Sequence, residues 1–123
     1  MSETVLLVDD DPVILRLLEL NFGLEGYDVL LAADAATALD LARSARVDVV
    51  VSDVMMPEMS GLELTVALRR GERTSAIPIL LVSARAQVDD IRAGTDAGAD
   101  DYVTKPFEPL DLVERVGALL ARR

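Results

Sequence analysis

The chain has 123 residues, 51% of them hydrophobic, and its 22 acidic residues outnumber its 12 basic residues to give a formal charge of −10. Because cysteine and histidine are both absent, the sequence excludes disulfides, zinc–thiolate sites, thiol catalysis and imidazole ligands or bases. The negative charge disfavours direct contact with nucleic acid, and no apolar run has the length needed to span a bilayer.

Five short apolar runs, the last of them weaker, predict five β-strands. They occupy residues 5–8, 29–32, 47–51, 79–82 and 102–104. The runs are continuous rather than alternating, which is typical of strands that other elements cover on both faces.

Segments with the apolar spacing of helices separate these runs. Asp11 and Pro12 supply a cap and a first helical residue for the first of them. Its apolar residues are Ile14, Leu17, Leu18, Leu20 and Phe22, and it ends at Gly26. The others are expected after Asp34, from Gly61 to before Gly71, through Val88 and Ile91 toward Gly98, and after Pro109. Strand and helix alternate throughout, which predicts an α/β fold with a doubly wound parallel sheet and right-handed crossovers.

Residues able to carry chemistry follow the ends of four predicted strands. They are Asp9 and Asp10 after the first strand, Asp53 after the third, Ser83 after the fourth and Lys105 after the fifth. In open α/β sheets, ligands bind beyond the carboxyl ends of the strands, near the point where the strand order reverses. If the first and third strands are neighbours, the three carboxylates converge there.

Such a convergence requires a cation or protons, because two like charges about 4 Å apart repel by roughly 4 kcal/mol at an effective dielectric near 20. A ligand set made only of oxygen favours Mg²⁺, which also accepts phosphate oxygens. Asp53 is the candidate nucleophile, since a carboxylate can form an aspartyl phosphate. Lys105 and a metal ion can neutralise charge during phosphoryl transfer without a histidine.

Three motifs resemble those of bacterial response-regulator receiver domains. They are VLLVDDDP at 5–12, DVMMP at 53–57 followed by Ser60 and Gly61, and GADDYVTKPF at 98–107. The length fits one compact domain, and the resemblance implies that residues 1–123 are a receiver domain. It also implies a flavodoxin-like (βα)5 fold whose parallel five-stranded sheet has the order 2-1-3-4-5.

The resemblance further implies a set of metal ligands and a phosphorylation site. Asp9 and Asp10 match the acidic pair that binds Mg²⁺ in this family. Asp53 matches the phosphorylated residue, which is also a metal ligand, and the backbone carbonyl of Met55 completes the ligand set.

Three more residues match family positions for catalysis and switching. Ser83 would hydrogen-bond the phosphoryl group, Lys105 would pair with its oxygens, and Tyr102 occupies the aromatic switch position. We hypothesise that phosphorylation draws Ser83 inward and that Tyr102 takes the vacated space. The surface of the fourth helix, fifth strand and fifth helix would then repack for output.

The resemblance names partners as well. The phosphodonor in this family is a phosphohistidine on a sensor histidine kinase or a phosphotransfer protein. Residues 105–115 also resemble receivers of the OmpR/PhoB type, which dimerise through the output surface just described. The charged residues that match that dimer pattern are Asp101, Asp111, Arg115 and Arg122, whereas Ile91, Arg92 and Thr95 depart from it.

Two outputs stay open: a stand-alone receiver that docks on a partner protein, or the N-terminal receiver of a longer regulator. The first residues do not form a signal-peptide pattern, so a cytoplasmic location is expected. We expect a signalling domain that catalyses only its own phosphorylation and dephosphorylation.

A haloacid-dehalogenase-like phosphatase is the alternative. It would use Asp9 as nucleophile with Asp11 two residues later, although Pro12 follows and a cap insertion is missing.

Overall fold

The computed structural model describes residues 2–123, which form a five-stranded parallel sheet flanked by helices. The strands are β1 (Thr4–Val8), β2 (Asp28–Ala32), β3 (Val49–Asp53), β4 (Ile79–Ser83) and β5 (Asp101–Thr104). The helices are α1 (Pro12–Leu24), α2 (Ala35–Ser44), α3 (Gly61–Arg70), α4 (Val88–Ala97) and α5 (Pro109–Arg122). Among these described residues, we find no helix with the length and hydropathy required to cross a membrane.

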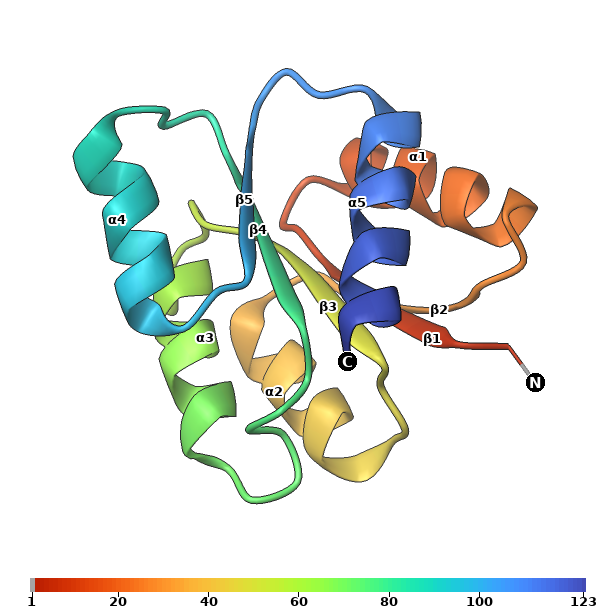
Figure 1. Ribbon diagram of the computed structural model, residues 1–123, viewed down its shortest axis with the longest axis horizontal. Coiled ribbons are helices and arrows are strands. Elements are labelled where there is room, and N and C mark those ends of the chain that lie inside the picture. The colour runs from red at the N-terminus through yellow and green to blue at the C-terminus, as the bar shows by residue number, and fades with distance from the viewer. Residues whose placement is uncertain (1) are drawn as a thin grey trace.

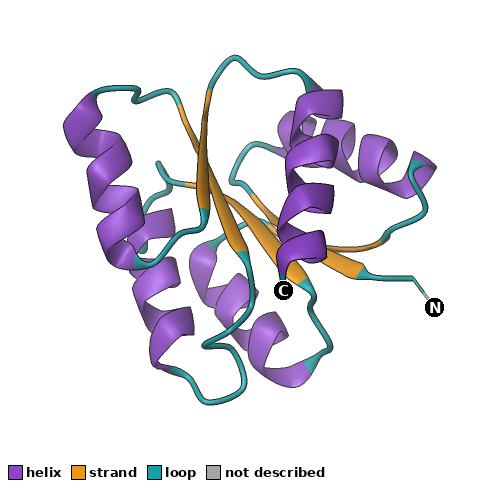
Figure 2. Ribbon diagram, in the orientation of Figure 1, coloured by secondary structure: helices purple, strands orange, loops and turns teal. Residues whose placement is uncertain are grey.

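The strand order β2-β1-β3-β4-β5 confirms the predicted doubly wound sheet. Helices α1 and α5 lie on one face, and α2, α3 and α4 lie on the other (Figure 1 and Figure 2). Each face has its own apolar cluster: Leu7 of β1 belongs to the cluster with Phe22, whereas the neighbouring Leu6 belongs to the cluster with Leu64. Alternate residues of one strand thus pack on opposite faces, which explains the continuous apolar runs.

Side-chain caps begin three of the helices shortly after strand ends. The Asp11 carboxylate accepts the Val13 N–H at 2.9 Å, and the Asp34 carboxylate accepts the Thr37 N–H at 2.7 Å. Ser60 begins α3 with a capping box. These caps satisfy backbone donors that a helix leaves free at its start, and they hold the loops at the carboxyl edge of the sheet.

Two helices bury a narrower set of residues than their apolar spacing indicates. In α1, Leu17 and Leu20 are 40% and 51% exposed. In α4, which lies beside the edge strand β5, Val88 and Ile91 are 70% and 39% exposed. Leu18 and Phe22 of α1 are buried as expected, together with Leu15, and the buried residue of α4 is Gly94. A helix contacts a sheet along one stripe, so apolar residues beside that stripe stay in solvent.

At the edge of the sheet where the strands begin, Arg123 forms two ion pairs. Its partners are Glu3, just before β1, and Asp48, just before β3. The Arg123 guanidinium lies 2.9 Å from the Asp48 carboxylate and 2.7 Å from Glu3. The other oxygen of Asp48 accepts the Thr4 N–H at 2.7 Å. Asp48 is buried, so these contacts satisfy a charge that would otherwise be costly to bury.

Candidate functional site

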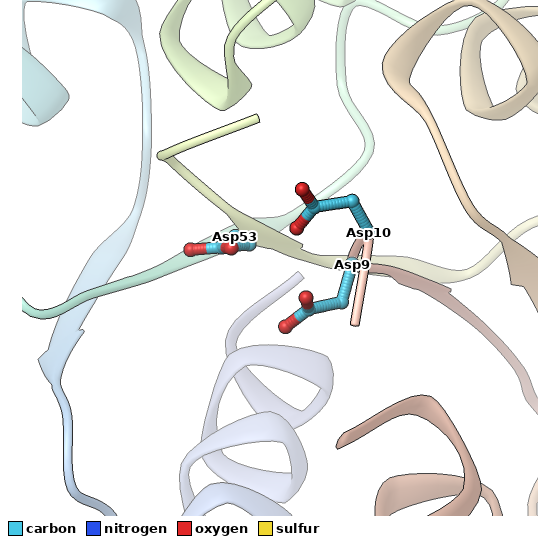
Figure 3. Close-up of side chains that lie close together, drawn as sticks. All are labelled: Asp9, Asp10 and Asp53. Atoms are coloured by element: carbon cyan, nitrogen blue, oxygen red, sulfur yellow. The ribbon is translucent and has the colours of Figure 1, made fainter. Parts of the chain in front are cut away.

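Three carboxylates meet where β1 and β3 end. Val8 of β1 pairs with Ser52 of β3, so Asp9 and Asp53 are the next residues on neighbouring strands. One oxygen from each of Asp9, Asp10 and Asp53 lies within 4.8 Å of the other two (Figure 3). Asp9 and Asp53 are buried and Asp10 is exposed, so the cluster opens to solvent on the Asp10 side.

Burial alters the acidity of the two enclosed carboxyl groups. It is the largest cause that raises the pKa of Asp9; the Asp11 N–H, which donates to this carboxylate at 2.9 Å, acts in the opposite direction. Burial also raises the pKa of Asp53, against the opposing charge of Lys105. Both groups therefore carry their negative charge at a cost, which a bound cation would relieve.

Lys105 supplies one positive charge to this cluster. Its Nζ lies 3.5 Å from Oδ2 of Asp9 and 3.5 Å from Oδ2 of Asp53. The Lys105 backbone N–H donates to the Ser83 carbonyl at 2.8 Å, and the peptide bond to Pro106 is cis. One ammonium among three carboxylates leaves a negative excess, the condition under which a divalent cation binds.

The loop after β3 lies against the cluster. Met55 is 49% exposed, and its N–H lies 3.4 Å from Oδ1 of Asp53. Gly61 lets the loop return closely, because a Cβ there would collide with the backbone carbonyl of Asp53. The Gly61 N–H donates to the Val54 carbonyl at 3.0 Å, which closes the loop beside the Asp53 carboxylate.

Ser83 and Tyr102 are linked through a residue that the sequence did not single out. The fully buried Ser83 hydroxyl accepts the Arg85 N–H at 3.1 Å. The Tyr102 hydroxyl donates to the Arg85 carbonyl at 2.9 Å. Both predicted switch residues, Ser83 and Tyr102, therefore form hydrogen bonds with the backbone of Arg85. A backbone role leaves no side-chain pattern, so the sequence offers no signal for it.

Charged residues near β5 have partners within the chain. Asp100 pairs with Arg69 at 2.8 Å. Asp101 and Asp111 both pair with Arg115 at 3.1 Å. Asp101, Asp111 and Arg115, three of the four residues that match the dimer pattern of OmpR/PhoB-type receivers, thus form intramolecular ion pairs.

Comparison with known proteins agrees with these features. The family model of the response regulator receiver domain matches residues 5–117. The chain is 46% identical over 122 residues to the transcriptional regulatory protein PrrA of Mycobacterium tuberculosis. It is 42% identical over 118 residues to the DNA-binding dual master transcriptional regulator RpaA of Synechocystis. These alignments cover 99% and 96% of this chain but 52% and 49% of the relatives, so the chain spans about half their length.

Solved structures are similar over nearly their whole length. The chemotaxis protein CheY4 of Vibrio cholerae has a TM-score of 0.92 at 34% identity, covering 97% of this chain and 99% of that one. The receiver domain of the sensor histidine kinase PA1611 from Pseudomonas aeruginosa has a TM-score of 0.90 at 30% identity, covering 98% and 99%. That structure has a magnesium ion coordinated in its active-site cleft.

Proposed function

Since this chain belongs to the family of response regulator receiver domains, we propose that it is a phosphoacceptor of two-component signalling, phosphorylated on Asp53. Residues 1–123 then make up one receiver domain. The observation that carries the proposal is the convergence of Asp9, Asp10 and Asp53 with Lys105 at the carboxyl edge of the sheet. Family membership also favours this function over a haloacid-dehalogenase-like phosphatase.

Asp53 supplies the nucleophile. An oxygen of its ionised carboxylate bonds to phosphorus while the bond from phosphorus to the donor's imidazole nitrogen breaks. The histidine leaves as neutral imidazole, with the proton that its other ring nitrogen already carries. The Lys105 Nζ, 3.5 Å from Oδ2 of Asp53, is placed to contact the oxygens of the arriving group. Ser83 ends the neighbouring strand β4, from which its hydroxyl can donate to the same group.

The donor set fits Mg²⁺. Asp9, Asp10 and Asp53 offer three carboxylate oxygens close together, and the Met55 carbonyl would add a fourth protein oxygen. When bound, Mg²⁺ supplies positive charge that offsets repulsion between the phosphoryl oxygens and the carboxylates. The magnesium in the cleft of the PA1611 receiver supports this assignment.

The hydrogen bonds through Arg85 connect the site to the output surface. Phosphorylated Asp53 presents new acceptors, and the Ser83 hydroxyl turns toward them. Arg85 is thereby released, and Tyr102 follows because its hydroxyl is bonded to the Arg85 carbonyl. A nearly complete switch requires about 5.5 kcal/mol of differential stabilisation. We propose that a downstream protein or output domain docks on the α4–β5–α5 surface, or that a phosphorylation-dependent homodimer forms there.

We propose that an exposed apolar face on α1 is the docking surface for the phosphodonor, a sensor histidine kinase or phosphotransfer protein. Val13, Leu17, Leu20 and Leu24 are 72%, 40%, 51% and 87% exposed. Their spacing places them on one side of the helix. Since α1 begins at Pro12, two residues after Asp10 of the carboxylate cluster, a protein that delivers a phosphoryl group to Asp53 also reaches this face.

The setting of this signalling domain follows from its chemistry and its relatives. Its charge of −10 argues for protein partners rather than direct contact with nucleic acid. The relatives twice its length are transcriptional regulators by name. We propose a cytoplasmic receiver that acts through an output domain or a separate protein and catalyses only its own phosphorylation and dephosphorylation.

Intact-mass spectrometry after incubation with acetyl phosphate and Mg²⁺ tests the proposal. The parent chain gains one phosphoryl group, and Asp53→Asn gains none. Asp48→Asn is the matched control, because Asp48 is also buried but lies at the opposite edge of the sheet. Labelling that persists in Asp53→Asn refutes the assignment.

A further inference from the structure

We propose that Gly94 of α4 is a positioning residue for the Tyr102 ring: the missing side chain sets where the ring lies, and so how Tyr102 couples to Ser83. This inference rests on the proposed function for its consequence in signalling. Its structural part concerns only how α4 packs against β5, and it can be tested without phosphorylation.

The ring of Tyr102 occupies the space that a side chain at position 94 would need. A Cβ on Gly94 would lie 2.9 Å from Cδ2 and 3.3 Å from Cε2 of Tyr102, and 3.4 Å from Cδ1 of Leu81. A separation of 2.9 Å is far inside the usual carbon–carbon contact of about 3.5–4.0 Å. An alanine at this position therefore displaces either the ring or the helix.

Gly94 lowers the stability of α4 but allows the helix to pack closely against the Tyr102 ring. Glycine within a helix lowers stability by roughly 0.5–1 kcal/mol relative to alanine. Gly94 is nevertheless the buried residue of α4, while Val88 and Ile91 of the same helix are exposed. The helix therefore approaches the sheet at Gly94, where the Tyr102 ring lies against its backbone.

Displacement of the ring would reach the phosphorylation site through bonds already described. The Tyr102 hydroxyl donates to the Arg85 carbonyl at 2.9 Å, and the Arg85 N–H donates to the Ser83 hydroxyl at 3.1 Å. A cavity of about 440 Å³, lined by Tyr102, Met55, Arg85 and Ala93, borders the ring and can receive it. A larger residue at position 94 thus moves the ring rather than unfolding α4.

The structural test compares Gly94→Ala with Gly117→Ala, both in a Tyr27→Phe background that leaves Tyr102 as the single tyrosine. Gly117 lies within α5, and a Cβ there meets nothing closer than the Tyr27 hydroxyl at 3.9 Å. With 3-fluorotyrosine incorporated, Gly94→Ala shifts the ¹⁹F resonance of Tyr102, whereas Gly117→Ala leaves it in place. An unmoved resonance in Gly94→Ala overturns the inference.

Unfolding equilibria provide a second readout. Gly117→Ala favours the folded state by roughly two- to fivefold, the usual gain for alanine over glycine in a helix. Gly94→Ala gives no such gain while Tyr102 is present, and regains it in a Tyr102→Ala background. Equal gains in both backgrounds would mean that the ring does not constrain position 94.

Phosphorylation then separates this inference from the proposed function. Gly94→Ala changes the rate of labelling by acetyl phosphate by about fivefold, the effect of losing one hydrogen bond, and Gly117→Ala does not. If the parent is not labelled on Asp53, the proposed function fails, while the resonance and unfolding results still decide the packing of Gly94. If the parent is labelled and Gly94→Ala is labelled at the same rate, the coupling to Ser83 is refuted.

Discussion

Replacement of Asp53 by asparagine should stabilise the chain when Mg²⁺ is absent, by about 1–2 kcal/mol at pH 7. The substitution keeps the size of the side chain and removes its charge. The reason is that the folded chain holds the Asp53 carboxylate where burial raises its pKa. A carboxyl group whose pKa is raised on folding lowers stability once the pH exceeds its unfolded pKa, because the folded state then gives up its proton at a cost.

The distances in the cluster indicate that burial, rather than the neighbouring charges, sets the size of this effect. Two charges 4.8 Å apart, the upper limit between these carboxylate oxygens, repel by about 3.5 kcal/mol at an effective dielectric of 20. Repulsion from the exposed Asp10 is reduced by solvent screening. The attraction of Lys105 at 3.5 Å is about 4.7 kcal/mol on the same scale. These charges nearly balance, so the remaining penalty is the cost of burying a carboxylate rather than an amide.

Urea unfolding at pH 7, with a chelator and then with excess Mg²⁺, measures this effect. Mg²⁺ should stabilise the parent by RT ln(1 + [Mg²⁺]/Kd) and stabilise Asp53→Asn much less. Asp48→Asn is the control of opposite sign: that carboxylate is paired with Arg123 and the Thr4 N–H, and its loss costs about 1–3 kcal/mol. If Asp53→Asn destabilises the metal-free chain as much as Asp48→Asn, the reasoning about the buried Asp53 carboxylate is wrong.

Three other outcomes are expected. Burial would raise the pKa of Asp48, but the Thr4 N–H and Arg123 lower it below its ordinary 3.8 overall; its stabilising effect is therefore present above pH 3.8 and lost as the pH falls through the lowered pKa. The urea midpoints of the parent and Asp48→Asn should converge below pH 3.8. A difference between the midpoints that stays constant with pH contradicts the lowered pKa of Asp48. Arg69→Ala removes the ion pair with Asp100 and bonds to backbone carbonyls, lowering stability by about 2–3 kcal/mol; an unchanged melting temperature argues against it. Lys105→Ala should slow labelling by acetyl phosphate about tenfold, or 1.4 kcal/mol, with the fold retained by circular dichroism; an unchanged rate excludes Lys105 from the reaction.

The fold could be predicted because its signals are local. Continuous apolar runs indicate strands covered on both faces, and the caps at Asp11 and Asp34 are read directly from the sequence. The spatial grouping of Asp9 and Asp53 follows from parallel strands that end at one edge. The roles of these residues in metal binding and phosphorylation stay predictions.

Other features depend on contacts that a sequence does not display. The apolar spacing of α1 and α4 does not reveal which stripe meets the sheet, so the exposure of Leu17 and Val88 required the structure. Arg85 acts through its backbone, and the use of Gly94 depends on a ring that β5 brings to it. Long-range packing and backbone hydrogen bonds decide these cases.

A crystal structure of the chain grown with Mg²⁺ and fluoroberyllate, an analogue of the phosphoryl group, tests the central claim most directly. The account predicts the ion among the carboxylates of Asp9, Asp10 and Asp53, the analogue on Asp53, and Lys105 and Ser83 in contact with its fluorines. Fluoroberyllate on another residue, or a metal ion bound away from these carboxylates at saturating concentration, would contradict it.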